Sequence, residues 1–176
     1  MFREAIALRV RVLGPTHPSV SDVQAGYARF LHLAGEDSKA DSLFRVILPV
    51  MRKDPGDDHT KVAQAELTWA LVRASLGDHD GAAARANDAL RIRRLAGGGE
   101  TTLVGLTLAD LARLALERGD FERADSLYHT ALEVVLRSYP PDHFDVRRIR
   151  AAMADFYDQW GKPDLAAESR AAAGGR

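Results

Sequence analysis

The sequence predicts an all-α protein, a right-handed superhelical solenoid of about nine helices in antiparallel pairs. Four columns of identical residues recur every 42 positions, as subtraction of their numbers shows. Apolar residues between these columns follow helical spacing. A fixed period of this length is typical of stacked helical repeats. The columns are Gly35, Gly77, Gly119 and Gly161; Ala40, Ala82, Ala124 and Ala166; Val20, Val62, Val104 and Val146; and Ala28, Ala70, Ala112 and Ala154.

The composition narrows the class of protein. Among 176 residues, 24 are Lys or Arg and 25 are Asp or Glu, a balance that argues against a nucleic-acid or anionic-membrane surface. Cysteine is absent, which removes disulfides, thiol catalysis and cysteine-bound metals. Charges interrupt the apolar residues from Met1 to Arg9, unlike a secretion signal, and no apolar run reaches the roughly 18 residues of a membrane helix. We expect a soluble, cytoplasmic protein.

Each repeat is predicted to begin with a helix of about 16 residues that ends near a column glycine. N-cap or acidic residues stand before these helices at Thr16, Asp58, Glu100 and Asp142, where they would satisfy free backbone N–H groups. A turn and a second helix follow each glycine. Pro49 falls inside the second helix expected over about 38–53, so we expect a kink near Arg45 to Pro49 or an early end.

The chain is predicted to form one array over residues 1–176, with repeats at 16–57, 58–99, 100–141 and 142–173. Ala96–Gly99 is then a loop between repeats and not a domain boundary. The last helix, from about Pro163, should be short and frayed. Residues 1–12 align with the second helix of a repeat whose first helix is missing. We expect a piece of a longer protein; the alternative is a natural start that this helix itself caps.

The element from Gly119 to Ala124, with a large residue four after the alanine (Phe44, Tyr128), resembles the tetratricopeptide repeat. The period exceeds the usual repeat of about 34 residues, and is similar to the longer repeat of kinesin light chains. The resemblance implies that first helices line a concave groove. It also implies paired asparagines in the first helix, which this sequence replaces, for example with Ala25 and Gly26.

The resemblance therefore implies a groove that binds a protein or peptide segment, in a manner other than through asparagines. Our hypothesis is that apolar side chains of the partner lie on Leu67, Leu71 and Leu106 while an acidic group meets Arg29 or Arg113. The alternative is a solvated face, or a face that contacts the rest of the same protein. The groove residues are Arg29, His32, Leu67, Leu71, Leu106, Arg113 and Asp155.

Other patterns have simpler structural interpretations. A histidine column (His17, His59, His143) lies in separate loops and lacks adjacent carboxylates at the spacing of metal ligands, so loop structure is favoured over a metal site. The run at 97–102 follows a helix and lacks the ending of a phosphate-binding loop. The carboxylates Asp155 and Asp158 read as surface charge. We predict no catalytic residue, no metal and no cofactor.

The sequence thus predicts a non-enzymatic protein-interaction scaffold, part of a larger signalling or regulatory protein. The alternative is a structural or oligomerisation segment that packs on its own chain or forms a homodimer through the unpaired first helix.

Overall fold

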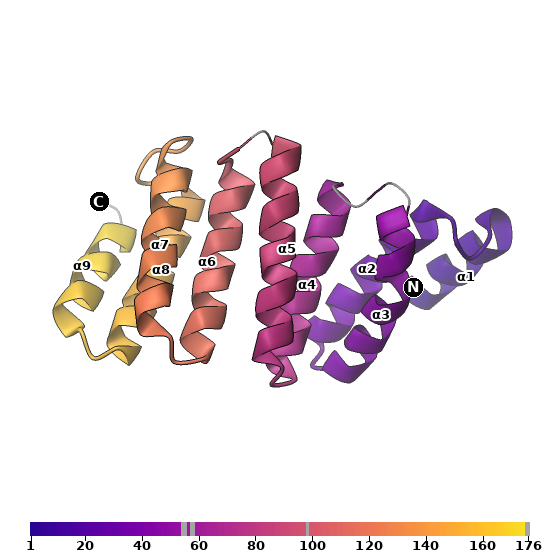
Figure 1. Ribbon diagram of the computed structural model, residues 1–176, viewed down its shortest axis with the longest axis horizontal. Helices are drawn as coiled ribbons and strands as arrows, with labels where there is room; N and C mark the ends of the chain where they lie inside the picture. Colours follow the sequence, from indigo (N-terminus) through magenta and orange to yellow (C-terminus); the bar gives the residue numbers. More distant parts are fainter. Residues whose placement is uncertain (54–55, 57–58, 98, 175–176) are drawn as a thin grey trace. The chain divides into compact units, whose positions relative to one another are not determined.

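The computed structural model describes residues 1–53, 56, 59–97 and 99–174. Over these residues the chain forms nine α-helices and no strands (Figure 1), so the prediction of an all-α protein is confirmed. None of these helices combines the length and hydrophobicity that a membrane span requires. The helices are α1 (Phe2–Leu13), α2 (Pro18–Leu33), α3 (Asp37–Lys53), α4 (Thr60–Ser75), α5 (His79–Gly97), α6 (Thr102–Glu117), α7 (Phe121–Leu136), α8 (Phe144–Gln159) and α9 (Pro163–Gly174).

The chain divides into two compact units, Met1–Ala96 and Gly97–Arg176. The first contains α1 to α5 and the second α6 to α9, and within each unit consecutive helices pack on one another (Figure 1). The division falls between Ala96 and Gly97, the last two residues of α5, so the expectation that the loop begins at Ala96 was wrong. That the repeats continue as one array over 1–176, with the limits given above, stays a prediction.

The N-caps of the first helices lie one residue later than predicted. The capping column is His17, His59, Thr101 and His143. In the three histidine caps, ring Nδ1 accepts a hydrogen bond from the backbone N–H two residues later, at 3.1, 3.1 and 3.2 Å. A helix begins with unpaired N–H groups that need such an acceptor, and this explains the histidine column. The predicted caps Thr16, Glu100 and Asp142 were wrong, and Asp58 lies outside the described residues.

Each first helix ends at a column glycine in the left-handed conformation. The four φ angles lie between 72° and 79°, a region that residues with a side chain rarely adopt. The residue after each glycine donates its N–H to the carbonyl oxygen four positions before the glycine, as Glu36 does to Leu31 at 2.8 Å. This double turn closes the helix and directs the chain into the second helix. The 42-residue spacing of the glycines therefore places one such turn in each repeat.

The other three columns form the core of the repeats. All twelve of their residues are 0 or 1% exposed, so the small alanines allow neighbouring helices to approach closely. Gly105 on α6 extends this pattern, because its Cα lies against α7. A Cβ added there would be 2.6 Å from Val135 Cγ2 and 3.1 Å from the carbonyl oxygen of Ala131.

Pro49 does not end its helix. Helix α3 continues through it to Lys53, so the expectation of an early end was wrong. Ile47, Leu48 and Met51 are buried around it, and their packing outweighs the one backbone hydrogen bond that proline cannot make.

Helix α9 has 12 residues, as short as expected.

A buried network of charges links α3, α4 and α5. The Glu66 side chain on α4 is completely buried, and its Oε1 accepts a hydrogen bond from Arg52 Nη2 on α3 at 2.5 Å. The same Arg52 nitrogen lies 2.5 Å from Asp88 Oδ2 on α5. Burial raises the pKa of Glu66 although Arg52 and Arg85 oppose this. Such a network disfavours other pairings of the helices, because any partner left alone would be a buried charge.

Asp41 on α3 is the centre of a second polar cluster. Its Oδ1 accepts from Trp69 Nε1 at 2.8 Å, and its Oδ2 accepts from Arg45 Nε at 2.8 Å. Arg73 on α4 lies 3.3 Å from Oδ1, and the Arg85 guanidinium covers the Trp69 ring at 4.1 Å. Burial by itself would raise the pKa of Asp41, but the hydrogen bonds from Trp69, Arg45 and Arg73 together lower it.

Two glycine substitutions test the close approach of α6 and α7. Gly105→Ala should lower the free energy of unfolding by about 1–2 kcal/mol, since overpacking outweighs the roughly 1 kcal/mol gained in helix propensity. Gly26→Ala is the matched control: its Cβ would be 3.7 Å from Phe2 Cε1, an ordinary contact, so the free energy of unfolding should rise by about 0.5–1 kcal/mol. Urea denaturation measures both changes. A rise for Gly105→Ala would contradict the close approach.

Asp41→Asn should destabilise the chain by about 1–3 kcal/mol at pH 7, since the amide can still accept from Trp69 but loses the charge that faces Arg45 and Arg73. A lowered folded-state pKa contributes stability above the unfolded value and loses it as pH falls through the folded value. The difference between the two proteins should therefore shrink below pH 3.8, the ordinary value. Denaturant titrations from pH 7 to pH 3 measure it, with exposed Asp142→Asn as control. An unchanged difference at pH 3 would refute this assignment.

Candidate functional site

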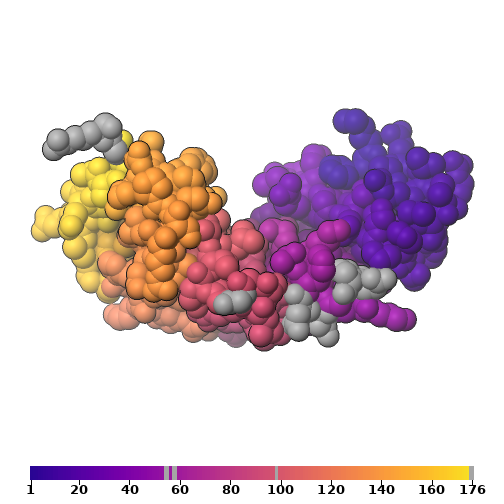
Figure 2. All heavy atoms as spheres, turned by 90° about the horizontal axis from the view of Figure 1, so that it is seen from above, coloured from indigo at the N-terminus to yellow at the C-terminus, as the bar shows by residue number. Residues whose placement is uncertain are grey.

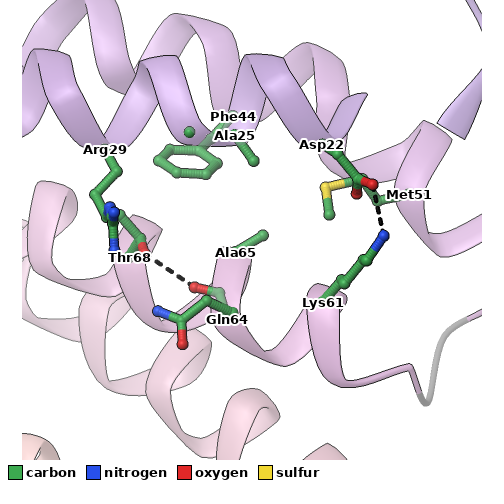
Figure 3. A pocket seen from close by; sticks show the side chains of 10 residues that line it. Asp22, Ala25, Arg29, Phe44, Met51, Lys61, Gln64, Ala65 and Thr68 are labelled. Carbon is green, nitrogen blue, oxygen red and sulfur yellow. Dashed lines mark hydrogen bonds and ion pairs between the residues drawn. The ribbon is translucent and has the colours of Figure 1, made fainter. Parts of the chain in front are cut away.

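A hollow of about 300 Å³ opens on the first unit between α2, α3 and α4 (Figure 3). Its position depends on the column alanines, which hold the three helices close together. First helices α2 and α4 form its sides, and second helix α3 forms its floor. The residues that line it are Asp22, Ala25, Gly26, Arg29, Phe44, Met51, Lys61, Gln64, Ala65 and Thr68.

The floor of this hollow is apolar. Phe44 and Met51, from α3, are 0 and 2% exposed, and small residues at Ala25 and Ala65 leave the space above them open (Figure 3). Phe44 is supported from below, because its ring stacks on Trp69 with centroids 6.0 Å apart. The hollow can therefore receive an apolar side chain on a floor that is already fixed by core packing.

The rim is polar, and its two ends differ. At one end Lys61 Nζ lies 2.6 Å from Asp22 Oδ2 and joins α4 to α2. On the α4 side, Thr68 Oγ1 donates to the Gln64 carbonyl at 2.9 Å (Figure 3). Arg29 stands at the other end; it is exposed, and among the described residues its guanidinium has no hydrogen-bond or ion-pair partner. This end offers a free cation beside an apolar floor.

The second unit contains a hollow at the equivalent position, with a volume of about 250 Å³ between α6, α7 and α8. Each of its lining residues lies 84 positions, or two periods, after a residue that lines the first hollow. Arg113 thus corresponds to Arg29, and Tyr128 corresponds to Phe44. The lining residues are Leu106, Ala109, Asp110, Arg113, Tyr128, Arg148, Ile149 and Ala152.

The two hollows differ chemically. Burial raises the pKa of the Tyr128 phenol to about 12, so this floor stays neutral at physiological pH and carries a hydroxyl that Phe44 lacks. Arg113 Nη1 donates to Glu117 Oε1 at 2.8 Å, and Arg148 lies 3.4 Å from Asp145. Both cations of the second hollow therefore have a carboxylate partner, in contrast to Arg29.

Three of the predicted groove residues line a hollow: Arg29 in the first, and Leu106 and Arg113 in the second. Leu67 is 6% exposed and has little surface for a partner. His32 Nδ1 lies 2.6 Å from Asp37 Oδ1 across the turn from α2 to α3. Leu71 is half-buried and Asp155 is exposed, and neither is among the residues that line these two hollows.

Sequence reasoning missed the floors and the ion pair at the rim. Phe44 and Tyr128 were recognised only as packing residues, although each lies four residues after a column alanine and the two are two periods apart, which marks the same spatial position. The contact of Lys61 with Asp22 joins residues 39 apart, nearly one period, and could have been found by placing neighbouring first helices side by side.

The other candidates take structural roles in the described residues. Asp158 pairs with Arg170 at 2.5 Å. Trp69 is 6% exposed, and Trp160 stacks on Phe121 with centroids 5.8 Å apart. In the run at 97–102, Thr101 is the N-cap of α6.

Comparisons with known proteins agree with this geometry. A family model described as "Tetratricopeptide repeat" matches residues 1–19 and 104–145. The structure of BtubC (BKLC) from P. vanneervenii superposes with a TM-score of 0.83 at 19% identity, over 98% of this chain and 69% of that one. The nearly identical TPR-like repeats of a Podosopora anserina protein, named as a kinesin light chain candidate, give a TM-score of 0.78 at 18% identity, over 98% and 82%. A comparison with curated protein sequences gives no match.

Proposed function

We propose that this chain, whose repeats are of the tetratricopeptide type, is a protein-interaction module that holds a partner segment against the hollows of its first helices. Proteins with this fold act in general as scaffolds for protein–protein contacts. The observation that carries the finer proposal is the free Arg29 guanidinium beside the apolar floor of the first hollow. We place the module in the cytoplasm, as a non-enzymatic part of a larger signalling or regulatory protein.

The chemistry of the first hollow defines the partner segment. A volume of about 300 Å³ lies at the lower limit of small-molecule pockets, so it suits one apolar side chain better than a whole ligand. An apolar side chain would rest on Phe44 and Met51. A neighbouring carboxylate would meet Arg29, in a charge-assisted and bidentate hydrogen bond. The segment therefore pairs an apolar residue with an acidic one.

In our proposal the second hollow makes a further contact with the partner, and this contact selects less strongly for an acidic group. Arg113 is already paired with Glu117, so a partner carboxylate would have to compete for it. The Tyr128 hydroxyl favours a polar or aromatic group on the floor. We propose that Leu67 and Leu71, which line neither hollow, contribute to the shape of the face and not to specific recognition.

A displayed library of random 12-residue peptides tests this proposal. The peptides that bind should be enriched in an apolar residue next to Asp or Glu. Arg29→Ala should weaken the best of them about tenfold, which corresponds to roughly 1.4 kcal/mol, and raised salt should weaken the wild-type complex in the same direction. Affinities are measured by fluorescence anisotropy.

Two variants serve as controls. Arg123→Ala removes an exposed arginine from α7, outside both hollows, and should leave the affinity unchanged. Ala25→Met should block the first hollow and weaken binding while thermal unfolding shows an intact fold. Peptides without an acidic residue, or an affinity that Arg29→Ala does not change, would refute the proposed role of this hollow.

A further inference from the structure

A third hollow lies between α1, α2 and α3, with a volume of about 590 Å³. In Figure 2 the indigo and purple spheres of these helices lie together in the first unit. Helices α1 and α3 form its sides and α2 forms its floor, whereas in the first hollow α3 is the floor. The two hollows share no lining residue. The third hollow is therefore a separate site on another surface of the repeats.

The floor of the third hollow is apolar and fixed by packing. Leu31 is 4% exposed and Tyr27 is half-buried, both on α2. The Tyr27 ring packs on Phe2 and Phe30, with centroids 5.6 and 6.4 Å apart. Leu43, on α3, is half-buried beside this floor. An apolar group can therefore enter the hollow without a rearrangement of the core.

The wall on α3 follows one stripe of that helix. Ser38, Ser42 and Val46 line the hollow, and because they are four residues apart they lie on the same helix face. At 1.5 Å per residue this stripe is about 12 Å long. Ser42 Oγ donates to the Ser38 carbonyl oxygen at 2.9 Å, and Val46 is 66% exposed. The hollow is thus elongated and suits an extended apolar group.

Arg3 supplies a cation on the α1 side. Its Nε donates to the Tyr27 hydroxyl oxygen at 3.1 Å, which holds the guanidinium beside the apolar floor. Among the described residues, neither the Arg3 Nη groups nor the Tyr27 hydroxyl hydrogen has a partner. These N–H and O–H groups form a donor set that fits a carboxylate. Arg45, one period after Arg3, is 61% exposed on α3, which packs on both α2 and α4, so this position is open inside the array too.

The charges around the third hollow favour a single negative charge. Lys39 also lines it, but its side chain is paired with Glu36. The Tyr27 hydrogen bond raises the pKa of Arg3, and the charge of Glu36 adds to this effect, so Glu36 acts on the same end of the hollow. Arg3 therefore remains as the cation without a carboxylate partner. A monoanion matches it, whereas a phosphate dianion would be repelled by Glu36.

The next repeat shows the same space when it is filled. Arg85 corresponds to Leu43 and Trp69 corresponds to Tyr27, one period apart in each case. The Arg85 guanidinium covers the Trp69 ring at 4.1 Å. In the first repeat a shorter, uncharged leucine stands at this position, and the space beside Tyr27 stays open. The opening is thus a consequence of one side chain in a shared backbone frame.

We propose that the third hollow binds a small monocarboxylic acid with an elongated apolar body. The carboxylate accepts hydrogen bonds from the Arg3 Nη groups and from the Tyr27 hydroxyl. The apolar body lies on Leu31 and Leu43 and extends along α3 toward Val46. The volume of the hollow falls in the range of small-molecule sites, about 300–1,000 Å³. This site is independent of the peptide contact proposed for the first hollow.

Titration of the whole chain with octanoate tests this proposal, with octanamide as the uncharged matched probe. Octanoate should shift the backbone amide NMR signals around Tyr27 and Leu43, and it should bind about tenfold more tightly than octanamide, since only the carboxylate forms charge-assisted bonds with Arg3. Arg3→Ala should remove this difference between the probes. Arg11→Ala is the control, because Arg11 is exposed on the same helix and lies outside the hollow; it should change neither affinity.

Leu43→Arg reproduces the arginine of the next repeat and should abolish the binding of both probes, while circular dichroism shows an intact fold. Arg29→Ala should leave octanoate binding unchanged, so failure of this site and failure of peptide binding at the first hollow are distinguishable. Equal affinities for octanoate and octanamide would overturn the proposal. So would signals that shift only around the first hollow, or no shift at any concentration of octanoate.

Discussion

The structure depends on a turn and a contact that recur together. A left-handed glycine closes each first helix by two backbone hydrogen bonds, and five residues later a fully buried alanine brings the second helix against the first. Only glycine adopts this backbone conformation without strain, and a larger residue than alanine would separate the helices. The spacing between the two residues sets where each second helix begins, so every repeat presents the same positions to its neighbours.

This repeated frame explains why one surface feature occurs twice. The hollow between α2, α3 and α4 and the hollow between α6, α7 and α8 use the same columns. The backbone supplies the cavity in both, and only the side chains differ. The first combines Phe44 with an Arg29 that has no partner among the described residues, which is the basis of our proposal, whereas Tyr128 and a paired Arg113 make the second more polar. A repeat protein can in this way vary recognition along its length while it keeps one scaffold.

The first unit buries charged side chains in its interior and exposes an apolar side chain at its edge. In its interior, Glu66 is completely buried and depends on Arg52, and Arg85 covers the Trp69 ring that hydrogen-bonds Asp41. Leaving any of these charges alone would be costly, so they restrict how α3, α4 and α5 pair. At its edge, α1 exposes Leu8, whose equivalents Ile92 and Val134 are buried. The pairing of helices in the interior is thus specified by its own side chains.

The sequence by itself determined the helical class, the length of the first helices and the core, because a period of 42 residues makes the same local signals appear four times. It also named Arg29, Leu106 and Arg113, which line the two hollows; that a partner binds there stays a prediction. Only the tertiary structure shows which atoms cap the helices, how far Leu67 is buried and which cations pair with a carboxylate. A capping bond depends on where a histidine ring nitrogen lies relative to one N–H, which shifted the cap from Thr16 to His17. Burial depends on neighbours far along the chain, as does the contact of Lys61 with Asp22. Periodicity reports which face a residue occupies, and only packing decides what that residue touches.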